Sequence, residues 1–301
     1  MKKFILPLAL MVCSNTFAVT VDDLGFKSVF RTFYPKMFNA SMRDMQEEVD
    51  RYQALDDQDK LTDDFKLPQV GVNDAKTQYL AFLYPPEPYK NANNEDRYLV
   101  YVKKREIAQS FDEHDRPDGY GFSDTCHACS SGRVDLYIFK KNANGTYDLV
   151  SRSKNNLDYA STYGDVALDV KGLSHRIVKT GENEVGFFDT TFHASHYGAT
   201  DNYLHLIRLN ETEVKGYLIA ESSGDNSGSY GEDEQSPLSY EYSSEYRTVE
   251  QPNVQDYPVE IKYKGDHYNE DKEKVEKFNK INRYVLNRVK GEYVLSSSQN
   301  Y

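Results

Sequence analysis

The chain has few cysteines and no tryptophan: three of its 301 residues are cysteine, and tryptophan is absent. After the first eighteen residues only Cys126 and Cys129 remain, so any thiol chemistry is confined to one short segment. Long hydrophobic runs are missing as well. A membrane-spanning helix needs roughly 20 consecutive apolar residues, and no segment after residue 18 reaches that length. The sequence therefore predicts no membrane span.

Basic residues are fewer than acidic ones. Lys and Arg total 36 and Asp and Glu total 48, which gives a formal net charge of −12. Such a chain repels nucleic acids and anionic lipid headgroups, whose binding needs basic patches that are not evident here. We therefore expect no nucleic-acid partner. The charge favours a basic protein or a divalent cation as ligand.

The first eighteen residues have the pattern of a secretory signal peptide. Met1-Lys2-Lys3 is a positive start, Phe4 to Val12 is apolar, and Thr16-Phe17-Ala18 is a small-x-small cleavage site. We expect cleavage after Ala18 and a periplasmic location in a bacterium. Cys13 leaves a lipoprotein open, although bulky Val12 stands where lipidation favours a small residue.

Residues 19–66 are expected to form a helical segment followed by an acidic linker. Apolar residues recur near helical spacing from Val21 to about Leu55, and an Asp-Asp pair lies at the start, where a helix favours negative charge. Pro35 is expected to break this segment, so that a second helix runs from Lys36 to Leu55. The acids of residues 56–64 then form the linker.

Residues 67–301 are expected to form a β-rich domain. Tyrosine, which suits half-buried strands, occurs 25 times. Asn142-Ala143-Asn144-Gly145 predicts a tight hairpin because Asn and Gly tolerate positive φ. The predicted strands cover residues 79–84, 97–102, 134–140, 146–152, 185–192, 202–209, 214–220 and 281–286. The fold class that follows is α+β and mainly β: an antiparallel sheet, sandwich- or barrel-like, with an N-terminal helical segment.

Residues 221–256 are expected to be an acidic excursion on the surface. This segment holds nine acidic residues and one basic residue, Arg247, with Ser, Gly and Tyr throughout. Such a segment suits a basic partner, and Ser223 to Gly228 also offers oxygen ligands for calcium, although not in the order of an EF-hand. The residues predicted to bind a partner are Asp225, Tyr230, Glu232, Asp233 and Glu234.

The pair Cys126 and Cys129 is expected to form a disulfide. Haem attachment needs His directly after the second cysteine, and Ser130 stands there, so haem is excluded. A thioredoxin-like pair needs a helix after it, whereas a strand is predicted from Val134. Zinc remains the alternative, because His193 and His196 supply a His-x-x-His pair that completes a Cys2His2 set. An oxidising periplasm favours the disulfide.

The order of motifs resembles a known group of proteins. Cys126-His127-Ala128-Cys129 is followed by a hairpin that ends in Gly-x-Tyr-x-Leu, and later strands lead to Gly224-Asp225-Asn226-Ser227-Gly228. This succession resembles an uncharacterised group of secreted bacterial proteins with a Cys-x-Ala-Cys motif, over residues 124–228. The resemblance implies a β-rich, secreted protein and carries no activity.

The function expected from these features is non-enzymatic binding of a protein partner in the periplasm, as an inhibitor or an immunity-like protein. The acidic, tyrosine-rich excursion and the lack of an assembled catalytic motif favour this interpretation. No cofactor is expected, with zinc or calcium as alternatives. The competing hypothesis is a metal-dependent hydrolase that uses His193 and His196 with nearby carboxylates.

Overall fold

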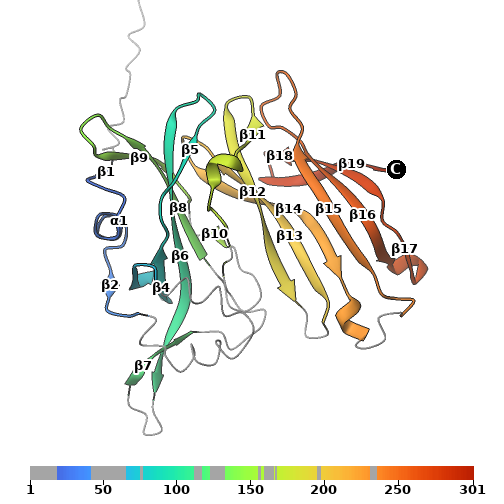
Figure 1. Cartoon of the computed structure of the whole chain (residues 1–301), viewed down its shortest axis with the longest axis horizontal. Helices are drawn as coiled ribbons and strands as arrows, with labels where there is room; N and C mark the ends of the chain where they lie inside the picture. Colours follow the sequence, from blue (N-terminus) through green and yellow to red (C-terminus); the bar gives the residue numbers. More distant parts are fainter. Residues whose placement is uncertain are drawn as a thin grey trace, which may run out of the picture.

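The computed structural model describes residues 19–41, 66–74, 77–111, 117–122, 133–154, 157–158, 166, 168–194, 198–230 and 236–301. In this part of the chain the protein is mainly β, with one α-helix near the N-terminus, as the sequence predicts. The strands pair antiparallel and form two curled sheets that lie side by side (Figure 1).

The first sheet is formed by residues 20–158. Its strands are β1 (Thr20–Val21), β2 (Met37–Phe38), β3 (Gln69–Asp74), β4 (Thr77–Leu83), β5 (Glu87–Lys90), β6 (Asp96–Phe111), β7 (Pro117–Phe122), β8 (Arg133–Lys141), β9 (Tyr147–Arg152) and β10 (Leu157–Asp158). They follow the order β1, β9, β8, β6, β4, β3, β2, while β10 pairs with β8, and β5 and β7 pair with β6. The long strand β6 therefore connects most of the sheet.

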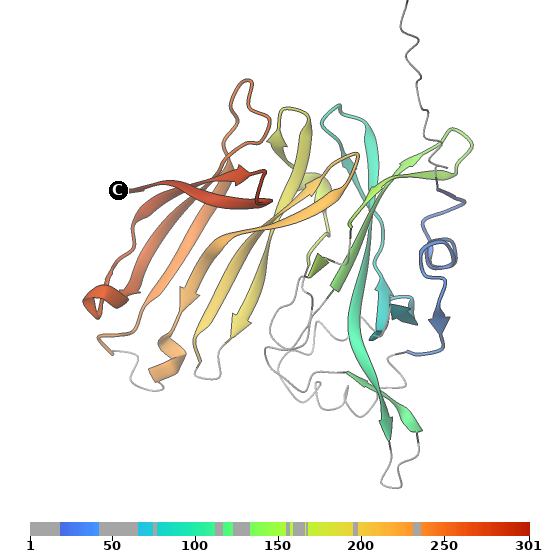
Figure 2. The ribbon, with the colours of Figure 1, turned by 180° about the vertical axis from the view of Figure 1, so that it is seen from behind.

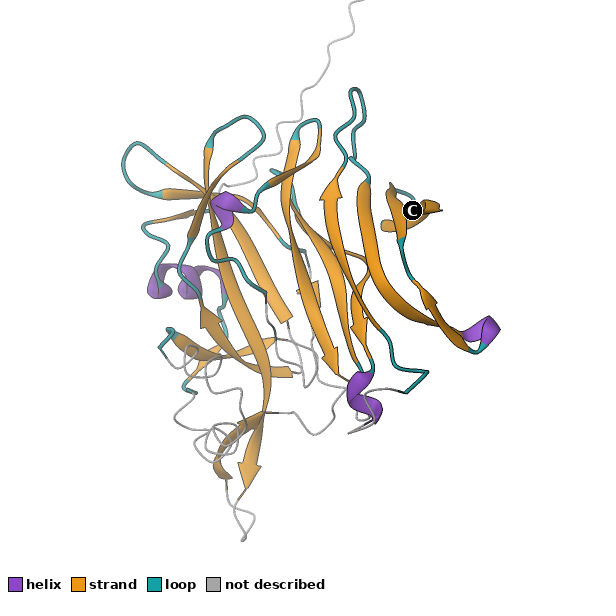
Figure 3. Ribbon diagram, turned by 45° about the vertical axis from the view of Figure 1, so that its right-hand side comes forward, coloured by secondary structure: helices purple, strands orange, loops and turns teal. Residues whose placement is uncertain are grey.

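The second sheet is formed by residues 178–300. Its strands are β11 (Val178–Gly181), β12 (Glu184–Ala194), β13 (Thr200–Leu209), β14 (Val214–Asp225), β15 (Glu241–Thr248), β16 (Val259–Asn269), β17 (Lys274–Lys277), β18 (Lys280–Asn287) and β19 (Glu292–Asn300). They lie in chain order, except that β17 pairs with β16 alone. The sheet curls toward the C-terminus (Figure 3), so that Tyr217 of β14 meets Tyr293 of β19 with ring centroids 5.5 Å apart.

The helix α1 (Phe26–Phe33) covers the face of the first sheet that is turned away from the second sheet (Figures 1 and 2). Apolar side chains at helical spacing bury this contact, and Phe30 is only 1% exposed. The helix ends before Pro35, which disfavours helical backbone in the residue ahead of it. It is much shorter than predicted, and Met37–Phe38 forms β2 where a second helix was expected to begin. Residues 42–65 of that prediction lie outside the described residues.

The two sheets pack against each other through a shared hydrophobic layer. The first sheet contributes Leu99, Leu136 and Ile138, and the second contributes Phe187 and Ile207; all five side chains are fully buried. Alternation along the strands explains this arrangement, because every second side chain of β6 and β8 points toward α1 and the others point toward the second sheet.

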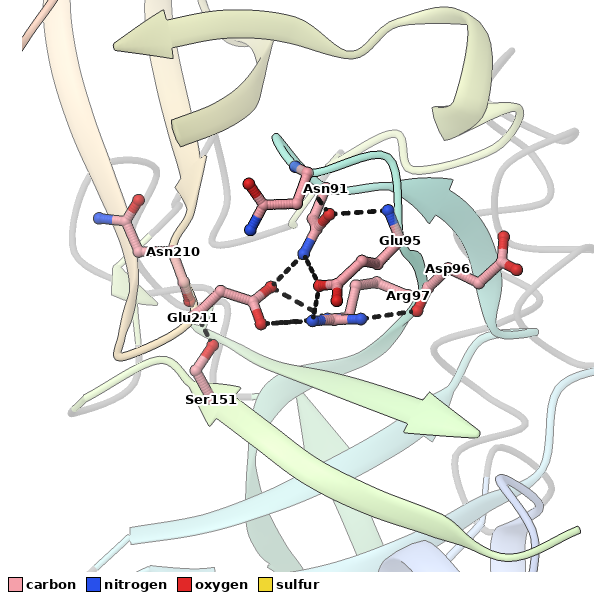
Figure 4. A network of polar contacts seen from close by, with 8 residues as sticks. Asn91, Glu95, Asp96, Arg97, Ser151, Asn210 and Glu211 are labelled. Atoms are coloured by element: carbon pink, nitrogen blue, oxygen red, sulfur yellow. Dashed lines mark hydrogen bonds and ion pairs between the residues drawn. The ribbon is translucent and has the colours of Figure 1, made fainter. Parts of the chain in front are cut away.

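A polar network also joins the sheets (Figure 4). Glu211, in the turn between β13 and β14, accepts from Arg97 of β6, with Nη2 to Oε2 at 2.6 Å and Nε to Oε1 at 3.0 Å. The side-chain amide of Asn91 donates to the same carboxylate at 3.2 Å. Ser151 of β9 donates to the carbonyl oxygen of Asn210 at 2.5 Å. The β13–β14 turn is thereby fixed against the first sheet.

Most strand predictions are confirmed, and the segment predicted as an acidic surface excursion contains strand residues. The hairpin of β8 and β9 closes as expected, with Asn142 N–H donating to the Thr146 carbonyl at 2.8 Å and Gly145 at φ 91°. The segment 221–256, expected to be a surface excursion, instead contributes the end of β14 and all of β15 to the second sheet. The Ser and Glu residues of β15 gave no apolar alternation from which to predict a strand, and β15 pairs antiparallel with the next strand, β16.

Candidate functional site

The strands β12 and β13 bring polar side chains together on one face of the second sheet. Their register places His193 opposite Asp201, Thr191 opposite Tyr203, and Asp189 opposite His205. Side chains directly opposite each other in an antiparallel pair lie on the same face and within contact distance. This face therefore carries histidine and carboxylate groups that are separated in the sequence.

Contacts between these side chains confirm that they share one face. The rings of His193 and Tyr203 meet edge to face, with centroids 5.1 Å apart. Thr191 Oγ1 and His205 Nε2 are 3.0 Å apart and form a hydrogen bond. Both contacts are diagonal in the register, which is the spacing that long and aromatic side chains bridge between strands.

The third strand, β14, adds Glu221 directly opposite Tyr203. Two register shifts occur between β13 and β14, on either side of this pair. Such β-bulges redirect side chains and occur beside functional sites. We define the second-sheet site as His193, Asp201, Tyr203, His205 and Glu221.

Gly224 lets a buried tyrosine approach the site. Gly224 lies opposite Asp201 on one side and opposite Tyr242 of β15 on the other. A Cβ atom at Gly224 would lie 2.8 Å from the Tyr242 ring and 3.0 Å from the Asp201 carboxylate. The missing side chain leaves room for both groups, so the ring and the carboxylate lie against the same backbone position.

The carboxyl groups of the second-sheet site have raised pKa values. Burial first, and the charge of Asp201 second, raise the pKa of Glu221 to about 7. Burial also raises the pKa of Asp201, while His193 and His267 lower it. Both carboxyl groups are half-buried. Their negative charges repel each other when both are ionised, so the doubly ionised form of the site is unfavourable.

The histidines of the site have lowered pKa values, which favours their neutral forms. Burial first, and the neighbouring His193 second, lower the pKa of His205 to about 4. Burial also lowers the pKa of His193, against the opposing effect of Asp201. In the described part of the chain, neither Asp201 nor Glu221 forms an ion pair with Lys or Arg. Among the described residues, the two carboxyl groups therefore have no lysine or arginine beside them to stabilise their ionised forms.

The predicted zinc set is only partly placed. His193 lies at the end of β12, while His196, Cys126 and Cys129 lie outside the described residues. Within the described ranges, no group of three His, Cys, Asp or Glu side chains is arranged to hold a metal ion. Neither the zinc set nor the disulfide is tested by these residues, and both remain predictions.

The predicted partner-binding residues lie at the end of β14 and beyond it. Asp225 is the last residue of β14, and its Oδ1 accepts from the backbone N–H of Ser227 at 2.7 Å, which fixes the following turn. Tyr230 ends a short 3₁₀ helix, Ser227–Tyr230. The remaining three residues, Glu232, Asp233 and Glu234, lie outside the described residues.

Sequence reasoning singled out His193 but missed Asp201 and Glu221. His193 belongs to a recognisable His-x-x-His motif, whereas the two carboxylates stand 20 residues apart in strands of ordinary composition. Only the strand register and its two bulges bring them together. Alternation along residues 201–205 offers a weak signal, since Asp201, Tyr203 and His205 share one face.

The described helices and the comparisons with known proteins complete the description of the chain. No helix in the described ranges is long and apolar enough to cross a membrane. The chain matches no protein-family model, and comparisons with curated proteins and with solved structures find no match either.

Proposed function

We propose that this chain is a secreted, non-enzymatic protein that binds a basic protein partner through the second-sheet site. The observation that carries the proposal is the pair of half-buried carboxylates, Asp201 and Glu221, which the described residues leave without Lys or Arg. A cationic side chain of a partner, placed beside this pair, relieves their mutual repulsion and holds both ionised.

Charge and aromatic content support the same partner class. The net charge of −12 attracts a basic protein and speeds its encounter. Tyr203 and His193 flank the carboxylates with flat, half-buried rings, and aromatic side chains are enriched where proteins bind each other. An inhibitor of a basic secreted enzyme, or an immunity protein against one, acts through such a surface.

The proposed compartment is the bacterial periplasm. The positive start, apolar stretch and small-x-small site of residues 1–18 support secretion. Fractionation of a bacterium that expresses the full chain tests this part of the proposal. We expect the protein in the periplasmic fraction, shortened by the leader, and mass spectrometry then reads the new N-terminus.

A pull-down tests the partner. Immobilised wild-type protein, the double variant Asp201→Asn/Glu221→Gln and the control Glu182→Gln are each exposed to periplasmic extract. The wild type and the control are expected to retain one stoichiometric basic protein that high salt releases. The double variant is expected to lose it. Glu182 is an exposed acid in the turn between β11 and β12, so its substitution changes the net charge without touching the site.

The isolated partner then gives a second measurement. A bound cation lowers the pKa of Glu221, so binding releases a proton and strengthens between about pH 6 and pH 8. Titration calorimetry in two buffers of different ionisation enthalpy measures this proton. The proposal fails if no stoichiometric, salt-sensitive partner is retained, or if the double variant retains it as well as the control does.

A further inference from the structure

A cavity of about 520 Å³ lies on the helix side of the first sheet. The end of α1, the strands β3, β6 and β8, and the residues that follow β9 surround it. We call it the first-sheet cavity and define it by Tyr34, Lys36, Lys104, Asp135, Tyr137 and Arg152. A cavity of this size, with a few converging polar groups, is the usual form of a small-molecule site.

A buried ion pair forms part of the cavity wall. The Lys104 side chain is 2% exposed, and its Nζ lies 2.9 Å from Asp135 Oδ2. The Asp74 carboxylate lies farther away, at 3.9 Å from the same nitrogen. The ammonium group also stands 5.6 Å from the centre of the Tyr79 ring. Removing two charges from water is costly unless they are paired in good geometry, and this pair satisfies that condition.

Two tyrosine hydroxyls extend the network from the ion pair. The Tyr137 hydroxyl donates to Tyr34 Oη at 3.2 Å, and the Tyr34 hydroxyl donates to Asp135 Oδ2 at 2.6 Å. Burial raises the pKa of both tyrosines, and the Asp135 charge raises both further, so both hydroxyls remain protonated. Asp135 is thus paired with Lys104 and oriented by Tyr34, while Asp74 places a second carboxylate on the cavity wall beside the same lysine.

The remaining cations give the cavity a positive character. Lys154 forms an ion pair with Glu213 at 3.5 Å. Lys36 and Arg152, by contrast, form no ion pair in the described part of the chain. Arg152 is near enough to Tyr137 to lower the pKa of its hydroxyl against the effect of burial. Two cations that lack an ion-pair partner among the described residues lie beside one cavity, in a chain whose net charge is −12.

We propose that the first-sheet cavity binds a small organic oxyanion, with its phosphate or carboxylate group held by Arg152 and Lys36. The guanidinium of Arg152 forms paired hydrogen bonds to such a group, and Lys36 adds a second charge. The rings of Phe33 and Tyr137, whose centroids are 4.4 Å apart, form an aromatic wall for the organic part of the ligand. This site is separate from the second-sheet site and does not depend on its function.

Calorimetric titration of the full protein tests the proposal. Inorganic phosphate and citrate serve as separate probes, with sodium chloride used to keep the ionic strength constant. We expect saturable binding of at least one probe. The probe that binds more tightly indicates whether the site prefers a phosphate or a carboxylate group. Loss of charge-assisted hydrogen bonds in Lys36→Gln/Arg152→Gln is expected to weaken binding about tenfold or more.

Two control variants complete the binding test: one removes an exposed charge away from the cavity, and one keeps the charge of Arg152. Lys27→Gln removes an exposed charge from α1, away from the cavity, and is expected to bind like the wild type. Arg152→Lys keeps the charge without the paired hydrogen bonds and is expected to bind with intermediate affinity. Circular dichroism confirms that each variant is folded. Absence of saturable binding for both probes, or equal binding by the double variant and Lys27→Gln, overturns the proposal.

Discussion

Arg97 in the first sheet and Glu211 in the second form an ion pair through two guanidinium nitrogens. Nη2 and Nε of Arg97 contact the two carboxylate oxygens of Glu211 at 2.6 Å and 3.0 Å. The guanidinium side chain is 9% exposed, whereas the carboxylate side chain is 43% exposed. The buried cation therefore depends on this contact more than the half-exposed anion does.

We expect the effects of substituting Arg97 and Glu211 on the free energy of unfolding to be coupled. Substitution Glu211→Ala leaves the buried guanidinium with one carboxylate partner, Glu95, whose Oε2 lies 2.8 Å from Nη2. The substitution is expected to cost about 1 to 2 kcal/mol, less than for a fully buried pair because water screens the carboxylate. Arg97→Ala is expected to cost more, since it also removes packing. Urea denaturation of both single variants and the double variant gives the coupling energy. Additive single effects would contradict a direct interaction.

The pKa of Glu221 predicts a pH dependence of stability. The ordinary value is 4.5, and burial with the Asp201 charge raises the pKa to about 7 in the folded protein. Below about pH 4.5 the group is protonated in both states. As the pH rises from about 4.5 to about 7, the unfolded state ionises while the folded state keeps its proton, so stability falls by about 1 to 2 kcal/mol after allowance for solvent screening, and the loss is complete above the folded pKa.

The variant Glu221→Gln isolates this effect. Its free energy of unfolding is expected to fall less than that of the wild type between about pH 5 and pH 8, because the titrating group is gone. Urea denaturation at the two pH values measures the difference, and Glu182→Gln serves as the exposed control. An unchanged pH dependence in Glu221→Gln would show that this carboxyl group titrates normally.

Gly224 is expected to tolerate no side chain. In Gly224→Ala, the new methyl group would lie 2.8 Å from the Tyr242 ring and 3.0 Å from Asp201, so one of them must move, at about 1 to 3 kcal/mol. Gly145→Ala is the comparison, because that position is open and costs only about 1 kcal/mol for its positive φ. Thermal unfolding compares the stability losses of the two variants. Equal losses would show that the Tyr242 ring and the Asp201 carboxylate do not pack tightly against Gly224.

The state of Cys126 and Cys129 is expected to be a disulfide in protein purified from the periplasm. The measurement is a thiol count of the denatured protein before and after reduction, together with elemental analysis for zinc. We expect no free thiol before reduction, two after it, and no stoichiometric zinc. Two free thiols with one equivalent of zinc, lost in His193→Ala and His196→Ala, would favour the hydrolase hypothesis instead.

Local chemistry made part of the fold predictable. The hairpin at Asn142–Gly145 follows from residues that tolerate positive φ, and the structure forms it as expected. The strand β15 was missed because its residues are mostly Ser, Glu and Tyr, without the alternating apolar pattern that marks a half-buried strand. A second helix was predicted after Pro35 because apolar spacing alone did not reveal the short strand β2 that forms at Met37–Phe38.

The second-sheet site was even less predictable than the fold. His193 belongs to a short motif, but the groups that give the site its charge, Asp201 and Glu221, belong to no motif. Their relation depends on two bulges between β13 and β14, and no local spacing in the sequence encodes a bulge. The first-sheet cavity escaped prediction for the same reason, since Lys36, Lys104 and Arg152 meet only after three distant segments pack.

The separation of the two sheets along the chain has a consequence for synthesis. Among the described residues, the strands of the first sheet end at residue 158, whereas the strands that cover its inner face, β12 and β13, begin at residue 184. A growing chain therefore completes one sheet while Leu99, Leu136 and Ile138 still face water. Nascent chains that stop before β12 are expected to expose this apolar face and to require a chaperone to stay dispersed.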